Sequence, residues 1–284
     1  MLTKISRFTD HIVTLAKKAV VGTPRPAVDR LSGRYADWVI VAIHGLREYL
    51  NQSYRGVIDL LKEMPRITRQ LGLSCHELPD FSTLCLRKQL LKMPVWRDFL
   101  RLSTTLHELG EIQAIDASGM DRIGASQHYA TRTNYTFKAV KTTLLIDCKT
   151  GTILDIHCSM KQPHDSQVGW RLLSRNLDKL DIITADKGYD WELLRRKLQA
   201  EGVTPVIKHR EFDWRGTAHN ALLDDETYQQ RSNVESTFFA LRQRYGSRLR
   251  ARTWFGQFRE LVLRCAVRNV ELAIKHSEPV ISSG

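Results

Sequence analysis

The segment from Glu111 to Tyr245 constrains the fold most, because its apolar pattern has first the period of strands and then alternates between the periods of helices and strands. Glu111–Asp116 alternates apolar and polar residues as a strand does, and Phe137–Asp147 and Thr152–Ser159 form a hairpin about Thr150-Gly151. The remaining pattern predicts helix 165–177, strand 181–186, helix 189–200, strand 203–207, loop 208–227 and helix 228–245. Three strands followed by alternating helices and strands predict an α/β domain with a mixed sheet and helices packed on it.

The last of these helices carries two adjacent stripes. At roughly 100° per residue, one stripe roughly 60° wide holds polar or charged side chains: Tyr228, Arg231, Glu235 and Arg242. The neighbouring stripe is apolar: Val234, Phe238, Leu241 and Tyr245. The helix can therefore bury one face and hold a carboxylate at the edge of that burial. The alternative is a surface helix with one Arg–Glu pair.

Three acids lie where a site would form. Asp116 ends the first strand on its apolar face, where an unpaired charge is costly, and Asp186 ends the strand 181–186. Both carboxylates are thus placed at the carboxyl ends of strands, where open α/β sheets hold their sites. Glu235 lies on the helix that borders the core. Carboxylates from three elements at one point are typical of a site for hard divalent cations.

Each acid also has a simpler interpretation. Asp116 could cap a turn, and the other two could form single ion pairs, Asp186 with Lys187 and Glu235 with Arg231. The order of the elements and the basic flanks favour the metal site over these three alternatives taken together.

Charge is unevenly distributed along the chain. The net charge is +12, residues 1–110 carry 17 Lys/Arg and 10 Asp/Glu, and residues 242–284 carry nine and three. Basic flanks favour a polyanionic partner, namely nucleic acid. No stretch approaches the roughly 18 apolar residues of a membrane span, and the amino terminus lacks a signal peptide pattern. The five cysteines show no metal-binding spacing, so we expect free thiols in a cytoplasmic protein.

Residues 1–108 form the predicted N-terminal helical region. Residues 1–30 indicate a short helix or arm, and helices follow at 35–50, 54–63, 66–74 and 79–91. The last two are compatible with a helix-turn-helix that reads DNA, with Arg87 and Lys88 placed for phosphate contact, or with plain helical packing. A basic helix is predicted at 255–275.

With these motifs the chain resembles the DDE transposases of prokaryotic insertion sequences, most closely the insertion-sequence-five-like group. Tyr228, Arg231 and Glu235 match the family signature Tyr-(2)-Arg-(3)-Glu-(6)-Lys, and Arg242 stands where the signature has Lys. Ile115–Ser118 and Thr184–Asp190 resemble the segments that hold the first and second family aspartates. Similar but shorter matches occur at Pro163–Ser166 and Pro79–Cys85.

The resemblance implies a fold, an activity and roles for residues. The fold would be a ribonuclease H-like mixed sheet (β-β-β-α-β-α-β-α) in a catalytic domain 109–284, after an all-α DNA-binding region 1–108. Asp116, Asp186 and Glu235 would be catalytic and would bind two Mg²⁺ ions, with Mn²⁺ as a substitute and no organic cofactor. The residues expected to contact DNA are Tyr228, Arg231, Arg242, Lys187, His164, Arg87 and Lys88.

The implied function is binding of terminal inverted repeats, then metal-dependent strand cleavage and strand transfer. The partners would be double-stranded DNA at transposon ends and target and a second copy of the chain in a synaptic homodimer, close to the nucleoid. Two alternatives remain: a catalytically inactive DNA-binding repressor derived from a transposase, and a structure-specific nuclease on the same fold.

Overall fold

The computed structural model describes residues 2–20, 22, 25–122, 139–161, 163–211 and 214–277. The chain divides into two units. The first combines Met1–Leu106 with Arg259–Gly284, and the second is His107–Phe258. The predicted domains were 1–108 and 109–284, the second with the basic C-terminal helix. In the structure most of the last helix groups with the N-terminal unit.

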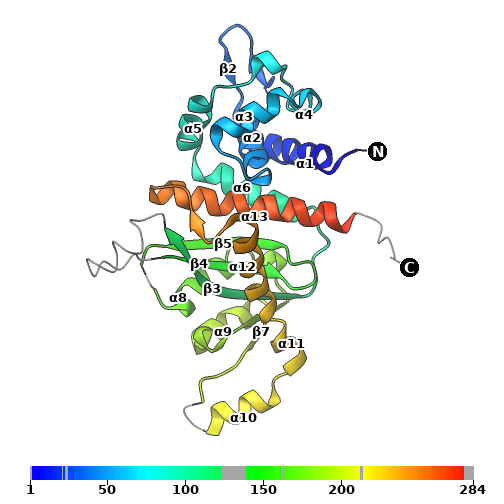
Figure 1. Ribbon diagram of the computed structural model, residues 1–284. Helices are drawn as coiled ribbons and strands as arrows, with labels where there is room; N and C mark the ends of the chain where they lie inside the picture. Colours follow the sequence, from blue (N-terminus) through cyan, green and yellow to red (C-terminus); the bar gives the residue numbers. More distant parts are fainter. Residues whose placement is uncertain are drawn as a thin grey trace, which may run out of the picture. The chain divides into compact units, whose positions relative to one another are not determined.

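The first unit is mainly helical (Figure 1). Its helices are α1 (Lys4–Ala19), α2 (Asp37–Tyr49), α3 (Tyr54–Lys62), α4 (Pro65–Gln70), α5 (Phe81–Leu90), α6 (Met93–Thr104) and the larger part of α13 (Trp254–His276). Helix α2 is buried from Trp38 to Glu48, as a helix that is apolar on nearly all sides must be. It approaches α1 closely, because a Cβ on Gly45 would lie 3.1 Å from Ile12.

The N-terminal region is not all-α as predicted. Two short antiparallel strands, β1 (Val28–Asp29) and β2 (Arg34–Tyr35), form a hairpin whose turn contains Gly33 at φ 65°. Strands of two residues are too short to show an alternating pattern, so they could not be predicted from apolar spacing. The segment 1–30, where a short helix or arm was predicted, contains a helix of 16 residues, and α6 was not predicted.

The second unit is built on a mixed sheet, as predicted. Its strands are β3 (Ile112–Arg122), β4 (Val140–Asp147), β5 (Ile153–Ser159), β6 (Ile182–Ala185) and β7 (Thr204–Ile207). They lie in the order β5-β4-β3-β6-β7, antiparallel from β5 to β3 and parallel from β3 to β7. The short strand β8 (Arg248–Leu249) pairs with the end of β3.

Helices pack against the sheet. The core of this unit joins strand residues such as Ile115, Leu145 and Ile183 to residues of α8 (Asp165–Leu173) and α9 (Glu192–Ala200). Helix α12 (Ser232–Tyr245) packs against β3 and β4. Side chains alternate along a strand, so Asp116 lies on the face opposite to its neighbour Ile115.

Several predicted boundaries in this unit need correction. Strand β3 continues to Arg122, well past Asp116, because it pairs with β4 and β8 beyond the end of β6. The expected loop 208–227 contains α10 (Trp214–Leu222) and most of α11 (Asp225–Gln229). The predicted helix 165–177 stops at Leu173, and a 3-10 turn follows at Leu177–Lys179. Residues 137–138 of the predicted hairpin lie outside the described residues.

The helix predicted from Tyr228 is interrupted. Helix α11 ends at Gln229 and α12 begins at Ser232, with i→i+3 hydrogen bonds from Arg231 to Tyr228 and from Val234 to Arg231 between them. The apolar stripe is nevertheless confirmed, because its four residues are at most 5% exposed: Val234, Phe238, Leu241 and Tyr245.

The hairpin β4–β5 offers a test of the fold. Asp147 is fully buried and its carboxylate accepts hydrogen bonds from Gly110 N (2.7 Å), Thr150 N (2.8 Å) and Thr150 Oγ1 (2.6 Å). Asp147→Ala leaves buried donors unpaired and should lower the free energy of unfolding by about 3 kcal/mol in a urea titration. The matched control is Asp178→Ala at an exposed position, which should change it by less than about 0.5 kcal/mol. Equal effects of the two changes would contradict this role for Asp147.

Candidate active site

The parallel ladder between β3 and β6 brings the first two predicted acids together. The last pair of this ladder is Ile115 with Ala185, so Asp116 and Asp186 are the next residues on neighbouring strands, which run about 4.8 Å apart. Asp186 directly follows β6 and caps the turn Lys187–Tyr189, where its carboxylate accepts a hydrogen bond from Gly188 N (2.8 Å). Asp116 Oδ1 accepts one from Ala117 N (2.7 Å). The site is thus fixed by backbone pairing.

Glu235 reaches the same region from α12. The segment before this helix is tied to the sheet by Thr184 Oγ1, which donates to Tyr228 O (3.4 Å), and by Cys148 Sγ, which donates to Gln230 O (3.6 Å). Glu235 itself is 57% exposed in its side chain and forms an ion pair with Arg231 (2.8 Å). The alternative of an Arg–Glu pair is therefore present in this structure, beside the two aspartates.

Negative charge and burial act together on Asp116. Desolvation raises the pKa of Asp116 to about 6, and the nearby carboxylates of Asp186, Glu235 and Asp165 raise it further against the hydrogen bond from Ala117. A pKa raised in this way shows that burial and neighbouring negative charge outweigh any nearby positive charge. Asp116 therefore interacts electrostatically with Asp186 and with Glu235.

The structure adds residues that the sequence did not single out as part of the site. Asp165 is the first residue of α8 after the cap His164, and it pairs with Lys141 Nζ (2.9 Å). Tyr189 is fully buried, and burial together with Asp165, Asp116 and Asp186 raises the pKa of its phenol. Its hydroxyl has no hydrogen-bond partner among the described residues. Lys141 belongs to no motif in the sequence, and it lies near the candidate site only because β4 pairs with β3.

Metal binding can be judged from the donor set. Carboxylate oxygens are the ligands that Mg²⁺ prefers, and Asp116 and Asp186 lie on adjacent strands. Within the described ranges, however, no group of three His, Cys, Asp or Glu side chains is already arranged to hold a metal ion. The third carboxylate would have to come from Glu235, whose side chain turns toward Arg231 instead. The donor types of these three residues suit a divalent cation.

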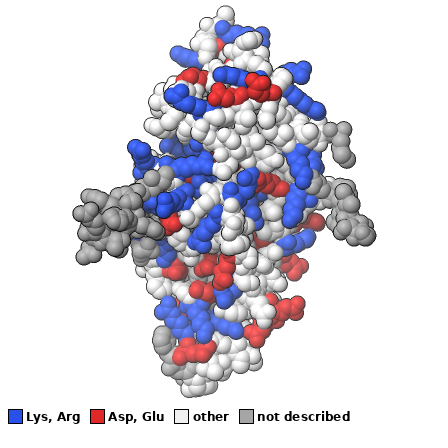
Figure 2. Space-filling view, viewed as in Figure 1, with Lys and Arg blue, Asp and Glu red and all other residues white. Residues whose placement is uncertain are grey.

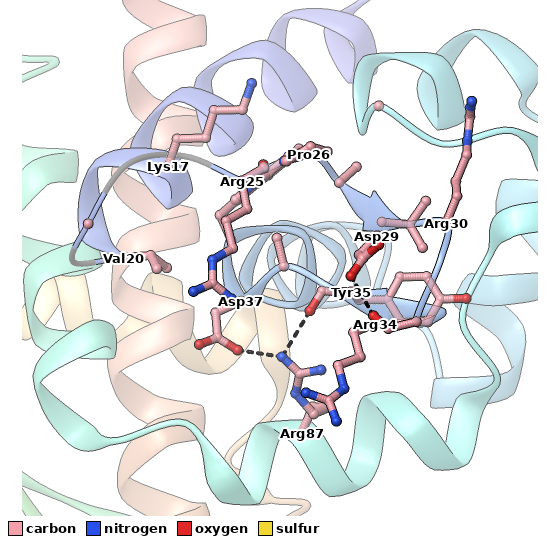
Figure 3. Close-up of a pocket in the computed structure, with 17 residues that line it drawn as sticks. Lys17, Val20, Arg25, Pro26, Asp29, Arg30, Arg34, Tyr35, Asp37 and Arg87 are labelled. Atoms are coloured by element: carbon pink, nitrogen blue, oxygen red, sulfur yellow. Dashed lines mark hydrogen bonds and ion pairs between the residues drawn. The ribbon is translucent and has the colours of Figure 1, made fainter.

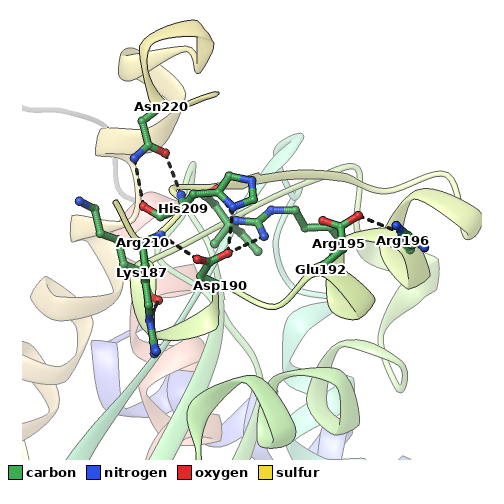
Figure 4. A network of polar contacts seen from close by, with 9 residues as sticks. Lys187, Asp190, Glu192, Arg195, Arg196, His209, Arg210 and Asn220 are labelled. Carbon is green, nitrogen blue, oxygen red and sulfur yellow. Dashed lines mark hydrogen bonds and ion pairs between the residues drawn. The ribbon is translucent and has the colours of Figure 1, made fainter. Parts of the chain in front are cut away.

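A polar network holds the segment after β7 to the turn that follows Asp186 (Figure 4). Asp190 is its centre: Oδ1 accepts from Arg195 Nη1 (2.6 Å) and lies 3.2 Å from His209 Nδ1, and Oδ2 accepts from Arg210 N (2.7 Å). Arg210 also donates to Lys187 O (3.2 Å). The network joins two segments beside the candidate site, which fixes where Asp186 can lie.

The predicted DNA-contacting residues of the second unit all have partners within the chain. His164 contacts Ser166 and Arg210, and Lys187 pairs with Glu211 (2.7 Å). The ring of Tyr228 is covered by Lys208, 4.4 Å from its centroid.

Arg242 fastens α12 to β3. Its Nη2 donates to Ser118 Oγ (2.5 Å) and Gly119 O (3.0 Å). In the lower part of Figure 2, acidic and basic side chains of this unit are interspersed.

The two candidates in the first unit are placed differently from the expectation. Lys88 is only 6% exposed, and burial and the neighbouring Arg47 lower its pKa to about 8. Arg87 is half-buried and its guanidinium binds Tyr35 O (3.1 Å) and Asp37 (2.5 Å). The apolar spacing of α5 did not show that Lys88 faces inward. Lys88 therefore has no exposed surface for a phosphate contact in this structure.

Three carboxylates therefore lie on a mixed sheet and on the helix packed against it: Asp116 within β3, Asp186 directly after β6 and Glu235 on α12. Residues 107–270 match the family model described as the transposase DDE domain, more than half of the chain, and the chain belongs to this family.

Two further comparisons were made. The chain resembles a solved structure of a piggyBac transposase, in a synaptic complex with hairpin DNA, at a TM-score of 0.50 and 12% identity. The match covers 95% of this chain and 72% of the other, and at this identity it concerns the fold alone. No curated protein matches. Across the described residues, no helix is long and apolar enough to cross a membrane.

The raised pKa of Asp116 predicts a pH-dependent stability. The folded state binds this proton more tightly than the unfolded state, whose pKa is near 3.8, so ionisation costs stability as the pH rises from about 4 to about 6. Without divalent cations, Asp116→Asn should therefore raise the thermal midpoint above that of the unmodified protein at pH 8 and lose this advantage below pH 4. Asp181→Asn, at an exposed position, should show no such difference. An Asp116→Asn midpoint that is no higher at pH 8 would contradict the electrostatic cluster.

Proposed function

We propose that this chain is the transposase of a prokaryotic insertion sequence of the insertion-sequence-five-like group, which cuts and joins DNA with Asp116, Asp186 and Glu235 as catalytic residues. The observation that carries the proposal is the β3–β6 pairing, because it places two carboxylates side by side next to the helix that bears the third. Membership of the transposase DDE family supports it. The sheet order β5-β4-β3-β6-β7 supports a ribonuclease H-like catalytic fold.

The proposed cofactor is a pair of Mg²⁺ ions, with Mn²⁺ as a substitute, held by Asp116, Asp186 and Glu235. When bound, such a pair activates a water or hydroxyl and stabilises the leaving oxygen of an in-line phosphoryl displacement. The tightly held proton on Asp116 supports this, because a cation would neutralise the same charge. Binding would need the ionised form, so affinity should fall below about pH 6.

Glu235 has a second role in this proposal through its pair with Arg231. Turning the Glu235 side chain toward Asp116 would supply the third carboxylate and would release the Arg231 guanidinium at the same time. A free guanidinium binds phosphate oxygens in bidentate fashion. The Arg231–Glu235 ion pair would thus be replaced by two contacts, one from Glu235 to the metal and one from Arg231 to DNA.

The remaining partners follow from the same function. Terminal repeats of double-stranded DNA would be bound with help from Tyr228, Arg242, Lys187 and His164, and two ends would be held by a homodimer at the nucleoid. Because Arg242 already fastens α12 to β3, its contribution would be to hold the helix in place as well as to contact DNA.

One observation favours a second candidate. The Arg231–Glu235 pair and the absence, in the described part of the chain, of three ligands already in place are what a catalytically inactive DNA-binding repressor would show. A structure-specific nuclease would differ in another way, because it would cut without joining. Incubation with the flanking end DNA and Mg²⁺ separates the three: joined products indicate a transposase, nicks alone a nuclease, and binding without nicks a repressor.

Glu235→Gln tests the assignment. The change keeps the size of the side chain and removes the charge, so end cleavage should fall by a factor of ~10² or more while end binding stays within about twofold. Cleavage is scored on a labelled end duplex with Mg²⁺, and binding by gel shift without it. Glu201→Gln, on the exposed end of α9, is the matched control and should cleave normally. Full strand transfer by the Glu235→Gln protein would refute the catalytic role.

A further inference from the structure

A cavity of about 920 Å³ lies in the first unit, and none of its lining residues belongs to the catalytic motifs (Figure 3). The hairpin β1–β2, the start of α2, the end of α1 and residues Gly72 and Arg87 line it. Its volume is within the range of cavities that hold small organic ligands, roughly 300–1,000 Å³. Nothing in the proposed catalytic function uses this cavity.

The framework of the cavity is held in a fixed shape. Trp38 is 4% exposed and its indole Nε1 donates to Arg25 O (2.9 Å), which fastens the chain segment that carries Arg25. In the hairpin, the Asp29 carboxylate accepts from Leu31 N (3.0 Å) and Ser32 Oγ (2.6 Å). These bonds also lower the pKa of Asp29. The walls are therefore formed before any ligand arrives, which reduces the entropy lost on binding.

The lining is strongly basic. Five of its side chains are cationic and two are carboxylates: Lys17, Arg25, Arg30, Arg34 and Arg87 against Asp29 and Asp37. Asp37 is paired with Arg87, and Asp29 is occupied by the hairpin turn. Neither Arg25 nor Arg34 has a side-chain hydrogen bond or an ion pair with any residue that the structure describes, and both are exposed.

Figure 3 shows how these cations are directed. The guanidiniums of Arg25 and Arg34 extend toward the side of the cavity where Arg87 pairs with Asp37. With five cationic side chains against two carboxylates, the lining carries an excess of positive charge. The planar donors of arginine match the oxygens of phosphate and carboxylate groups in bidentate fashion.

The other walls suit a base or sugar. Val28 and Tyr35 are half-buried partners in the hairpin, and Pro26 and Trp38 add apolar surface. Lys17 lies over the Trp38 ring, 4.6 Å from its centroid. Aromatic and apolar walls beside arginines are the combination by which proteins hold an unstacked nucleotide. The bases inside an intact duplex are paired and stacked, so they cannot enter such a cavity.

We propose that this cavity binds a nucleoside phosphate unit, with the phosphate on Arg25 and Arg34 and the base or sugar against Val28 and Tyr35. The unit comes either from an unpaired stretch of a DNA strand or from a free nucleotide, which share this chemistry. The inference does not depend on the proposed transposase activity, because it rests on residues of the first unit alone.

The test is a calorimetric titration of the full chain without divalent cations. The probes are deoxyadenosine 5′-monophosphate, a short oligothymidylate and inorganic phosphate. The double variant Arg25→Ala with Arg34→Ala should weaken binding of the first two probes by about tenfold or more, because each charge-assisted contact contributes to affinity. The charge-matched control is Arg66→Ala with Arg69→Ala on exposed positions of α4, which should bind as the unmodified protein does.

Val28→Trp distinguishes binding inside the cavity from attraction to the positive charge of the surface. It keeps every cation and fills the space beside Tyr35, so it should also weaken binding by about tenfold, and circular dichroism will show that each variant is folded. Tighter binding of the oligothymidylate than of the mononucleotide assigns the site to a DNA strand, and equal binding assigns it to a free nucleotide. The inference would be overturned if either cavity variant bound the nucleotides unchanged, or if the Arg66/Arg69 control lost as much affinity. It would also be overturned if neither nucleotide probe bound, or if inorganic phosphate bound as tightly as the nucleotides.

Discussion

The parallel pairing of β3 with β6 is the constraint on which the candidate site depends. It fixes Asp116 and Asp186 next to each other by backbone hydrogen bonds, so the repulsion between two carboxylates cannot be relieved by moving them apart. Burial adds to this repulsion, and the pKa of Asp116 rises to about 6. The sheet therefore holds a concentration of negative charge that is unfavourable by itself and that a bound cation would neutralise.

Helix α12 is the second element of the site, and its apolar face decides where Glu235 can be. Val234 and Phe238 are buried on either side of that residue in the sequence, and Arg242 fastens the far end of the helix to Ser118. The backbone of Glu235 is consequently fixed while its side chain remains 57% exposed and free to change partner. For Glu235 to leave Arg231 and bind a metal ion, its backbone must stay fixed while its carboxylate moves.

Much of this could be predicted from the sequence, because it depends on local patterns. The apolar spacing identified the sheet and the buried stripe of α12, and the spacing of Tyr228, Arg231 and Glu235 pointed to the family. Asp186 follows the end of β6 as predicted, whereas Asp116 lies within β3, which continues to Arg122. The parts that were missed depend on contacts between distant segments. Lys141 reaches Asp165 only because β4 pairs with β3, and Tyr189 meets the acids only after the turn behind β6 has folded. Local spacing also could not show that Lys88 is buried or that the helix breaks before Ser232.

The central claim is that Asp116, Asp186 and Glu235 form one metal site. Its most direct measurement is a calorimetric Mn²⁺ titration at pH 8 of the unmodified protein and of Asp186→Asn, with Asp181→Asn as the control. If the site is as described, the unmodified protein and the control will bind about two Mn²⁺ ions, and Asp186→Asn will lose that binding. Equal Mn²⁺ binding by Asp186→Asn and the unmodified protein would contradict the claim.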